Sequence, residues 1–250
     1  MPFPTVEESH NHSALVLNVL YEFDDFMESI STVCDMGGGA GWDSLWWSTR
    51  TVREDELTPT PLNIKSTVID IKDTFDVEHE NVKFVQADFE ETGLKPEQFD
   101  VIWSHDSFQY ALNPIKTLSH WWELANPDAM LVIQVPQTTN IRHNRQDFTQ
   151  ENFTYNHMTV VNLIHMLAVS GWDCKDGYFY KKPTDPWIRL AVYKSDIKPM
   201  DPRTTTWYDL VEKNLLPISA EQSINKWGHL RQQDLELQWL DRSLEAFFNH

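Results

Sequence analysis

The sequence predicts an α/β fold in which a mostly parallel sheet is covered by helices on both faces. Apolar runs typical of buried strands alternate with segments of helical periodicity through residue 170. The run Phe99–Ser104 is apolar on both of its faces, as an inner parallel strand requires. Two last strand patterns are separated only by Lys182–Pro186, which predicts a closing antiparallel hairpin.

The elements follow in order from these patterns. Apolar residues at helical spacing over 13–29 predict an amphipathic helix before the first strand. Pro114 favours a helix start, and Gly171 favours a helix end. The Pro-rich run Thr58–Pro61 indicates a turn or loop. We expect strands at 32–36, 66–71, 82–86, 99–104, 129–135, 174–181 and 187–194, and helices at 42–53, 114–125 and 157–169.

The chain ends in a segment of different character. From about residue 199 it contains no strand pattern, and helical patterns lie near 205–215 and 220–248. We expect these helices to form a lid over a substrate site, the face of a homodimer, or an appended helical pair. The predicted organisation is an N-terminal helical segment (1–30), a central α/β domain (31–196) and a helical extension (197–250).

Composition narrows the function. The 38 acidic and 20 basic residues leave a formal net charge of −18, which repels phosphate backbones and disfavours a nucleic-acid substrate. No apolar run approaches the roughly 20 residues of a membrane span, so we expect no membrane partner. The run Met1–Glu8 has no basic patch and no apolar core, so we expect no secretion signal, and the two cysteines and ten histidines show no metal-ligand spacing. We therefore expect a cytoplasmic protein without a metal.

The most informative segment is the run from Ser31 to Gly41, which predicts a strand, a tight turn and the start of a helix. The dinucleotide fingerprint G-x-G-x-x-G fails here, because its third position falls on Trp or Ser. The P-loop also fails, since no Gly-Lys-Ser/Thr follows. The turn contains four glycines: Gly37, Gly38, Gly39 and Gly41. They allow close backbone contact with a ligand that is neither a dinucleotide nor a nucleoside triphosphate.

Acidic residues lie where the parallel strands end, at the edge where ligands bind in such sheets. Asp35 can face a ligand ammonium, Asp70 can accept hydrogen bonds from ribose hydroxyls, and Asp88 from an adenine amine beside Phe89. Each Asp alone could instead be a helix cap or a solvated loop residue. Together with the glycines they indicate a nucleoside that carries a positively charged amino-acid tail.

On these residues the chain resembles the class I S-adenosylmethionine (SAM)-dependent methyltransferases over about residues 30–195. Asp35-x-Gly-x-Gly-x-Gly41 is similar to their first motif, Val68–Ile71 to their second, and Gln86–Phe89 to their adenine-binding turn. The resemblance implies a Rossmann-like seven-stranded sheet with an antiparallel last strand. It also implies SAM as cofactor and S-adenosylhomocysteine as product. Asp70 then binds ribose, Ile71 lies beside adenine, and Ser104 lies on the cofactor side.

The run Phe99–Tyr110 is similar to the fourth strand and substrate-side loop of that family, and is nearest to N-methyltransferases of glycine, sarcosine or phosphoethanolamine. Those proteins have a His where Tyr110 stands. The family's Lys-Pro-Gly-Gly turn is replaced by Asn126–Ala129. The resemblance implies methyl transfer to a nitrogen or oxygen of a small-molecule acceptor.

Acceptor residues are predicted at the same edge. We expect Asp106 and Tyr110 to face the acceptor, with His105 or His143 as a base; His105 could equally be a loop residue that the backbone holds. Four further residues are candidates for binding the acceptor, and each has a second interpretation. Arg142, His143 and Arg145 form either an anion clamp or pairs with surface carboxylates, and Tyr21 either contacts the acceptor or packs against the sheet.

Three other functions stay open. The same fold can use SAM for a different reaction, such as aminopropyl transfer. It can also serve as a non-catalytic binding module that acts through its helical tail. A nucleic-acid methyltransferase is opposed by the charge, and by Ser104–Ser107 in place of an Asn/Asp-Pro-Pro-aromatic motif.

Overall fold

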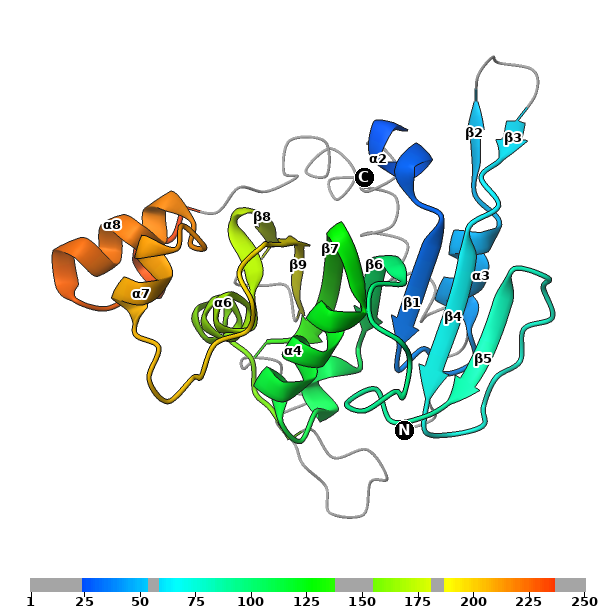
Figure 1. Cartoon of the computed structure of the whole chain (residues 1–250), viewed down its shortest axis with the longest axis horizontal. Coiled ribbons are helices and arrows are strands. Elements are labelled where there is room, and N and C mark those ends of the chain that lie inside the picture. Colours follow the sequence, from blue (N-terminus) through cyan, green and yellow to red (C-terminus); the bar gives the residue numbers. More distant parts are fainter. Residues whose placement is uncertain (1–23, 54–58, 138–154, 181–186, 237–250) are drawn as a thin grey trace.

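A seven-stranded sheet organises the chain in the computed structural model, which describes residues 24–53, 59–137, 155–180 and 187–236 (Figure 1). The strands lie in the order β5-β4-β1-β6-β7-β9-β8. Only β9 runs antiparallel to its neighbours, so the predicted fold class is confirmed. The strands are β1 (Thr32–Met36), β4 (Lys65–Asp70), β5 (Val82–Gln86), β6 (Phe99–His105), β7 (Ala125–Pro136), β8 (Trp172–Tyr180) and β9 (Trp187–Lys194).

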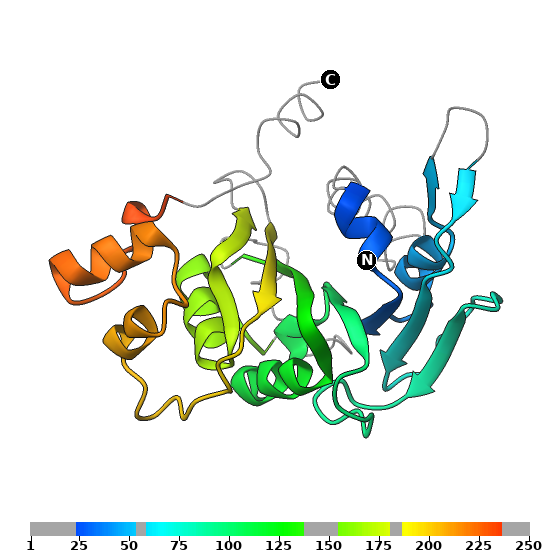
Figure 2. The same cartoon turned by 45° about the horizontal axis from the view of Figure 1, so that its top comes forward.

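Helices pack on both faces of this sheet, as Figure 2 shows. Side chains alternate between the faces because successive residues of a strand point in opposite directions. Val33, Val101 and Trp103 pack beneath α2 (Asp24–Ser29) and α3 (Trp42–Ser48). Their strand neighbours Cys34 and Ile102 belong to the larger core on the other face, beneath α4 (Pro114–Leu124) and α6 (Val160–Val169).

Local signals in the sequence fix the ends of these helices. Asn113 precedes α4, and its side chain accepts a hydrogen bond from the Lys116 amide, with Pro114 in the first turn as predicted. Thr159 and Asn162 form a reciprocal capping box at the start of α6. After α6, Gly171 adopts φ +86°, a left-handed conformation that glycine tolerates best.

Two predicted elements are wrong in extent. The helix expected over 42–53 ends at Ser48, and Thr51–Arg53 (β2) instead pairs antiparallel with Pro59–Pro61 (β3), part of the expected loop. The hydroxyl of Thr49 accounts for the early end, because it donates to the carbonyls of Leu45 and Trp46 in the last turn.

The C-terminal segment also differs from the expected pair of helices. It forms α7 (Trp207–Glu212), α8 (Ile218–Trp227) and a 3₁₀ turn, η2 (Gln232–Asp234). The helical pattern expected near 220–248 is interrupted where Gly228 ends α8 with φ +75°, and its residues 237–248 lie outside the described residues. These helices lie beyond the β8 edge of the sheet, where the Cys174 amide donates to the Leu215 carbonyl (Figure 1).

The opposite edge is less covered. The connections on either side of β5, residues 71–81 and 87–98, contain no helix, although the sequence pattern favoured regular alternation of strands and helices. Packing there comes from side chains of the connections themselves, such as Phe75, which stacks on Phe84 with ring centroids 5.3 Å apart. The connections at the β5 edge of the sheet are thus loops, while helices cover the faces of the central strands.

Asp100 joins the amino ends of three neighbouring strands. One of its carboxylate oxygens accepts hydrogen bonds from the amides of Ser31 and Thr32 and from the Thr32 hydroxyl, and the other accepts from the Asn126 side chain. Partial burial opposes the charged form, but these hydrogen bonds outweigh it and lower the pKa of Asp100. Asp100 therefore stabilises the sheet above pH 4, and this contribution is lost as the pH falls through its lowered pKa.

We predict that Asp100→Asn lowers the free energy of unfolding at pH 7 by about 1–2 kcal/mol, a value reduced by the partial exposure of the site. Urea denaturation measures this change, and the difference from the native protein should shrink toward pH 3. Asp128→Asn is the matched control, because Asp128 is exposed and its φ of +62° suits asparagine. Equal effects of the two substitutions at pH 7 would contradict the role of Asp100.

Candidate cofactor and acceptor site

The glycine loop between β1 and α3 is tied to the end of β4. The amides of Gly37 and Gly38 both donate to the carbonyl of Ile69, and the Gly39 amide donates to Oδ2 of Asp70 at 3.0 Å. The side chain of Asp70 also accepts from the Lys72 amide at 2.8 Å. Asp70 therefore fixes the position of the loop as well as lying at the rim of the site.

The glycines of this loop are required for two different reasons. A Cβ at Gly37 would lie 2.5 Å from the Cβ of Ser107, and a Cβ at Gly41 would lie 2.7 Å from the ring of Phe75. Gly39 has a positive φ of +51°, yet a Cβ there would meet nothing within 4 Å. The loop thus packs tightly against the protein at both ends, and its middle faces open space.

Asp35 lies beneath the loop and is almost fully buried. Its Oδ2 accepts a hydrogen bond from the Ser44 hydroxyl at 3.0 Å, and a Cβ at Gly38 would lie 2.5 Å from its carboxyl group. Burial and the nearby carboxylate of Asp43 raise the pKa of Asp35 to about 8, although Ser44 and His105 act in the other direction. The group supports the loop from below and is mainly protonated at pH 7.

The segments that follow β4 and β5 form two rims beside the loop, and they are more open than the loop's ends. Ile71 directly follows β4 and is 60% exposed, which is unusual for an isoleucine next to a buried strand. Asp88 is exposed, and its carboxylate accepts from the Glu90 amide. Phe89 is half-buried with its ring against Trp121, and it approaches the position of a Gly37 Cβ to 3.7 Å. These residues surround the open side of the loop.

The turn after β6 is attached to the glycine loop. The hydroxyl of Ser107 donates to the carbonyl of Met36 and lies 2.8 Å from the hydroxyl of Ser104. Ser104 is buried in β6, so its side chain supports the turn from inside. The turn leads into a 3₁₀ turn, η1 (Phe108–Tyr110), in which Tyr110 is half-buried.

Asp106 stands in this turn with a positive φ of +51°, a conformation that is uncommon for residues other than glycine, asparagine and aspartate. Its amide donates to the carbonyl of Gln134, and its Oδ1 accepts from the Gln109 side chain at 2.6 Å. The strained backbone is therefore held from two sides.

His105 pairs with a residue that the sequence analysis did not select. Its Nδ1 lies 3.1 Å from Oδ2 of Asp43 in the first turn of α3, and the indole of Trp103 donates to the same oxygen at 2.9 Å. Burial favours the neutral ring, but the hydrogen bond and charge of Asp43 outweigh it and raise the pKa of His105. This arrangement suits a residue that connects α3 to β6 better than it suits a free base.

Comparison with known proteins agrees with this geometry. Residues 34–133 match the family model described as a methyltransferase domain. These residues run from β1 through β7 and include the glycine loop, both rims and the turn after β6. The match covers 100 of the 250 residues and assigns a methyltransferase domain to this segment.

Solved structures share the fold at low sequence identity. A SAM-dependent methyltransferase of Mesorhizobium loti is 13% identical, with a TM-score of 0.54, over 72% of this chain and 100% of that one. Human N-acetylserotonin methyltransferase in complex with SAM is 18% identical, with a TM-score of 0.50, over 75% of this chain and 53% of that one. A Galdieria sulphuraria protein, provisionally assigned as a sarcosine dimethylglycine methyltransferase, is 12% identical, with a TM-score of 0.54, over 72% and 85%. A search of curated proteins found no match.

The residues of the glycine loop and of the segments beside it fit S-adenosylmethionine, the ligand of the human structure. A nucleoside needs an uncovered backbone to approach and an apolar surface for its base, and the structure offers open space at Gly39 and an exposed side chain at Ile71. Each carboxylate oxygen of Asp70 accepts one amide hydrogen bond, which leaves capacity for ribose hydroxyls. The SAM cation also suits a site lined by carboxylates.

Several expected site residues lie outside the described residues: Tyr21, Arg142, His143 and Arg145. Within the described part of the chain, no group of three His, Cys, Asp or Glu side chains could hold a metal ion, and no helix could cross a membrane. Asp43, Ser44 and Ser107 form hydrogen bonds with predicted site residues, and the sequence analysis missed them. The signal for Ser107 was its spacing of three residues from Ser104 in a turn, and Asp43 and Ser44 carried no comparable signal.

We predict that Gly39→Ala and Gly37→Ala have different effects, although both residues have a positive φ. Gly39→Ala should cost about 1–2 kcal/mol of stability and weaken the binding of S-adenosylhomocysteine, because the new methyl group occupies the ligand's space. Gly37→Ala should destabilise the fold further, since its methyl group meets Ser107. Thermal unfolding and titration calorimetry measure the two properties. Unchanged ligand affinity in Gly39→Ala would contradict the assignment of the open side.

The raised pKa of Asp35 predicts how the stability of the protein changes with pH. A folded pKa of about 8 lies above the ordinary value, so Asp35 favours the folded state at low pH, and stability is lost as the pH rises from about 4 to about 8. Asp35→Asn keeps a neutral hydrogen-bonding group and removes this loss. Urea denaturation should show that the variant gains on the native protein between pH 5 and pH 8.5.

The control for this experiment is Asp73→Asn, because Asp73 is an exposed carboxylate close to the same rim. Its offset from the native protein should change little over the same pH range. An offset for Asp35→Asn that is equally constant would show that Asp35 ionises in its usual range.

Proposed function

We propose that the protein transfers the methyl group of SAM to a nitrogen or oxygen atom of a small-molecule acceptor. The observation that carries this proposal is the attachment of the β6 turn to the glycine loop through Ser107 and Met36. Asp106 precedes Ser107 in this turn and Tyr110 follows three residues later, which supports a role for both residues near the cofactor. A compact polar turn of this kind suits a small acceptor.

The proposed cofactor contacts follow from the positions of the residues. Asp70 binds the ribose hydroxyls, Ile71 and Phe89 enclose the adenine, and Asp88 accepts from its amine. Asp35 and Ser104 support the loop and the turn from inside the protein. The backbone that approaches the ligand belongs to Gly37, Gly38, Gly39 and Gly41.

Bound SAM supplies an activated methyl group on a sulfonium. The protein's task is therefore to orient the acceptor atom in line with that group and to exclude water. We propose that Asp106 and Tyr110 contact the acceptor, and that His105, held by Asp43, is a positioning residue. Asp106 can take a proton or hold an ammonium group in line, according to the state in which the acceptor arrives.

The charge of the chain supports a small molecule over a nucleic acid. A formal net charge of −18 repels a phosphate backbone and attracts a cationic cofactor. We further propose a cytoplasmic location and a division into segments 1–30, 31–196 and 197–250. In this proposal α7 and α8, which lie beyond β8, offer a face for a homodimer (Figure 1).

Asp106→Asn tests the proposal, because asparagine tolerates the positive φ of this position and removes only the charge. We expect methyl transfer to fall by about 10²-fold or more while the affinity for S-adenosylhomocysteine is retained. The measurement combines calorimetry with mass spectrometry of acceptors incubated with methyl-labelled SAM. Product mass separates methyl transfer from transfer of another SAM fragment.

The matched control is Asp128→Asn, a second aspartate with positive φ, which is exposed near the start of β7, at the opposite end of that strand from the site. It should leave transfer unchanged. Unchanged transfer in Asp106→Asn would remove this residue from the acceptor site. Binding of S-adenosylhomocysteine without transfer to any acceptor would favour a non-catalytic module.

A further inference from the structure

Gln109 is a buried glutamine in η1, three residues after Asp106. The two polar atoms of its side chain differ in their surroundings. The Nε2 atom donates a hydrogen bond, whereas the Oε1 atom has no partner among the residues that the structure describes. An unsatisfied buried oxygen costs stability, so an apolar side chain of the same length would suit this position at least as well for folding alone.

The partner of the Gln109 side chain is the carboxylate of Asp106. Nε2 of Gln109 donates to Oδ1 of Asp106 at 2.6 Å. This contact fixes the orientation of the amide, because a carboxylate oxygen accepts a hydrogen bond from an N–H group and repels the amide oxygen. Gln109 thus gives one half of its amide to Asp106 and leaves the other half unsatisfied.

Backbone contacts hold the same turn without the Gln109 side chain. The Asp106 amide donates to the Gln134 carbonyl, and the Gln109 carbonyl accepts from the amide of Asn156 at 3.0 Å and from its side chain at 3.3 Å. The Ser107 hydroxyl donates to the Met36 carbonyl. None of these contacts orients the carboxylate of Asp106, whose side chain has several staggered rotamers. The side chain of Gln109 therefore adds control of that carboxylate to a turn whose backbone is already fixed.

We propose that Gln109 is a positioning residue for methyl transfer, and that it holds the Asp106 carboxylate in the rotamer that meets the acceptor. Displacement at a sulfonium requires the acceptor atom to lie in line with the methyl group, so a rotated carboxylate would misalign it. This inference rests on the proposed function, in which Asp106 contacts the acceptor, and deepens it. The unsatisfied Oε1 is then a loss of stability that the protein accepts for activity.

Gln109→Met tests the inference, because methionine keeps the length of the side chain and removes both the donor and the unsatisfied oxygen. We expect the free energy of unfolding in urea to be unchanged or higher. The kcat for methyl transfer should fall by about ten-fold or more, while KM for the acceptor and the affinity for S-adenosylhomocysteine change little. Stability and activity would thus separate in one variant, which a purely structural role of Gln109 does not predict.

Gln109→Glu adds a readout that depends on pH. Two neighbouring carboxylates repel each other when both are charged, whereas at lower pH they can share a proton that restores a hydrogen bond between positions 106 and 109. Transfer by this variant, expressed relative to the native protein at the same pH, should recover as the pH falls from about 8 to about 6. A ratio that is constant over this range would contradict the inference.

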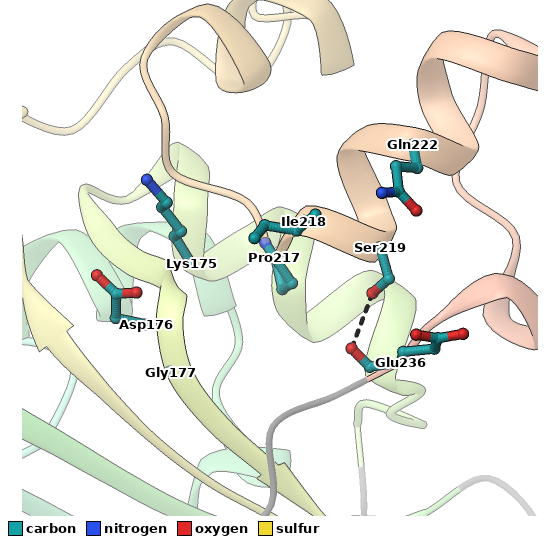
Figure 3. A pocket seen from close by; sticks show the side chains of 8 residues that line it. All are labelled: Lys175, Asp176, Gly177, Pro217, Ile218, Ser219, Gln222 and Glu236. Atoms are coloured by element: carbon teal, nitrogen blue, oxygen red, sulfur yellow. Dashed lines mark hydrogen bonds between the residues drawn. The ribbon is translucent and has the colours of Figure 1, made fainter.

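Gln222→Met is the matched control. Gln222 is an exposed glutamine of α8 and lines a cavity of about 280 Å³ between α8 and β8, at the edge of the sheet away from β4 and β5 (Figure 3). The same chemical change at this distance should leave kcat, KM and their pH dependence unchanged. An equal loss of transfer in Gln222→Met and Gln109→Met would overturn the inference.

Crystal structures of the native protein and of Gln109→Met test the inference without turnover. We expect the Asp106 side chain to change rotamer while the backbone of residues 104–111 stays in place. A carboxylate that keeps its native position would overturn the inference, and so would native transfer in Gln109→Met.

Failure of this inference differs from failure of the proposed function. Native transfer in Gln109→Met with a loss in Asp106→Asn would overturn the role of Gln109 and leave the proposed function intact. Native transfer in Asp106→Asn would remove Asp106 from the acceptor site, and the role of Gln109 with it. If the native protein methylates no acceptor, the proposed function fails, and the crystal structures still decide whether Gln109 orients Asp106.

Discussion

The position of the glycine loop depends on hydrogen bonds that reach it from two sides. From β4, the Ile69 carbonyl and the Asp70 carboxylate accept its amides; from the β6 turn, the Ser107 hydroxyl donates to the Met36 carbonyl. Parallel strands bring these groups to one edge of the sheet, although they are far apart in sequence. The loop is thereby held rigid at both ends with its middle open, and a preorganised backbone loses little entropy when a ligand binds.

The same edge concentrates negative charge, and the protein manages it by burial and pairing. Asp35 is buried and mainly protonated, Asp43 is paired with His105 and Trp103, and Asp70 accepts backbone amides. Each carboxylate therefore has a compensating group or a proton. A cationic cofactor entering this edge meets groups that already hold the loop in position, so support of the loop and recognition of the ligand are linked.

The strand pattern and the cofactor edge were accessible from sequence because both depend on local signals. Apolar runs locate β1, β4, β5 and β6 to within about a residue, and the glycine spacing locates the loop. The β2–β3 hairpin was missed, since Thr51–Arg53 continues an apparently helical segment and only pairing with β3 makes it a strand. The Asp43–His105 pair was also inaccessible, because tertiary packing between α3 and β6 creates it. Roles for the individual site residues stay predictions.

The account's central claim is that the open middle of the glycine loop holds the adenosyl group of SAM. A crystal structure with S-adenosylhomocysteine tests this most directly. The account predicts the nucleoside over Gly39, with its ribose at Asp70 and its adenine against Ile71. A ligand bound elsewhere, or a loop that must break the bond between Gly39 and Asp70 and still leaves Ile71 uncovered, would contradict it.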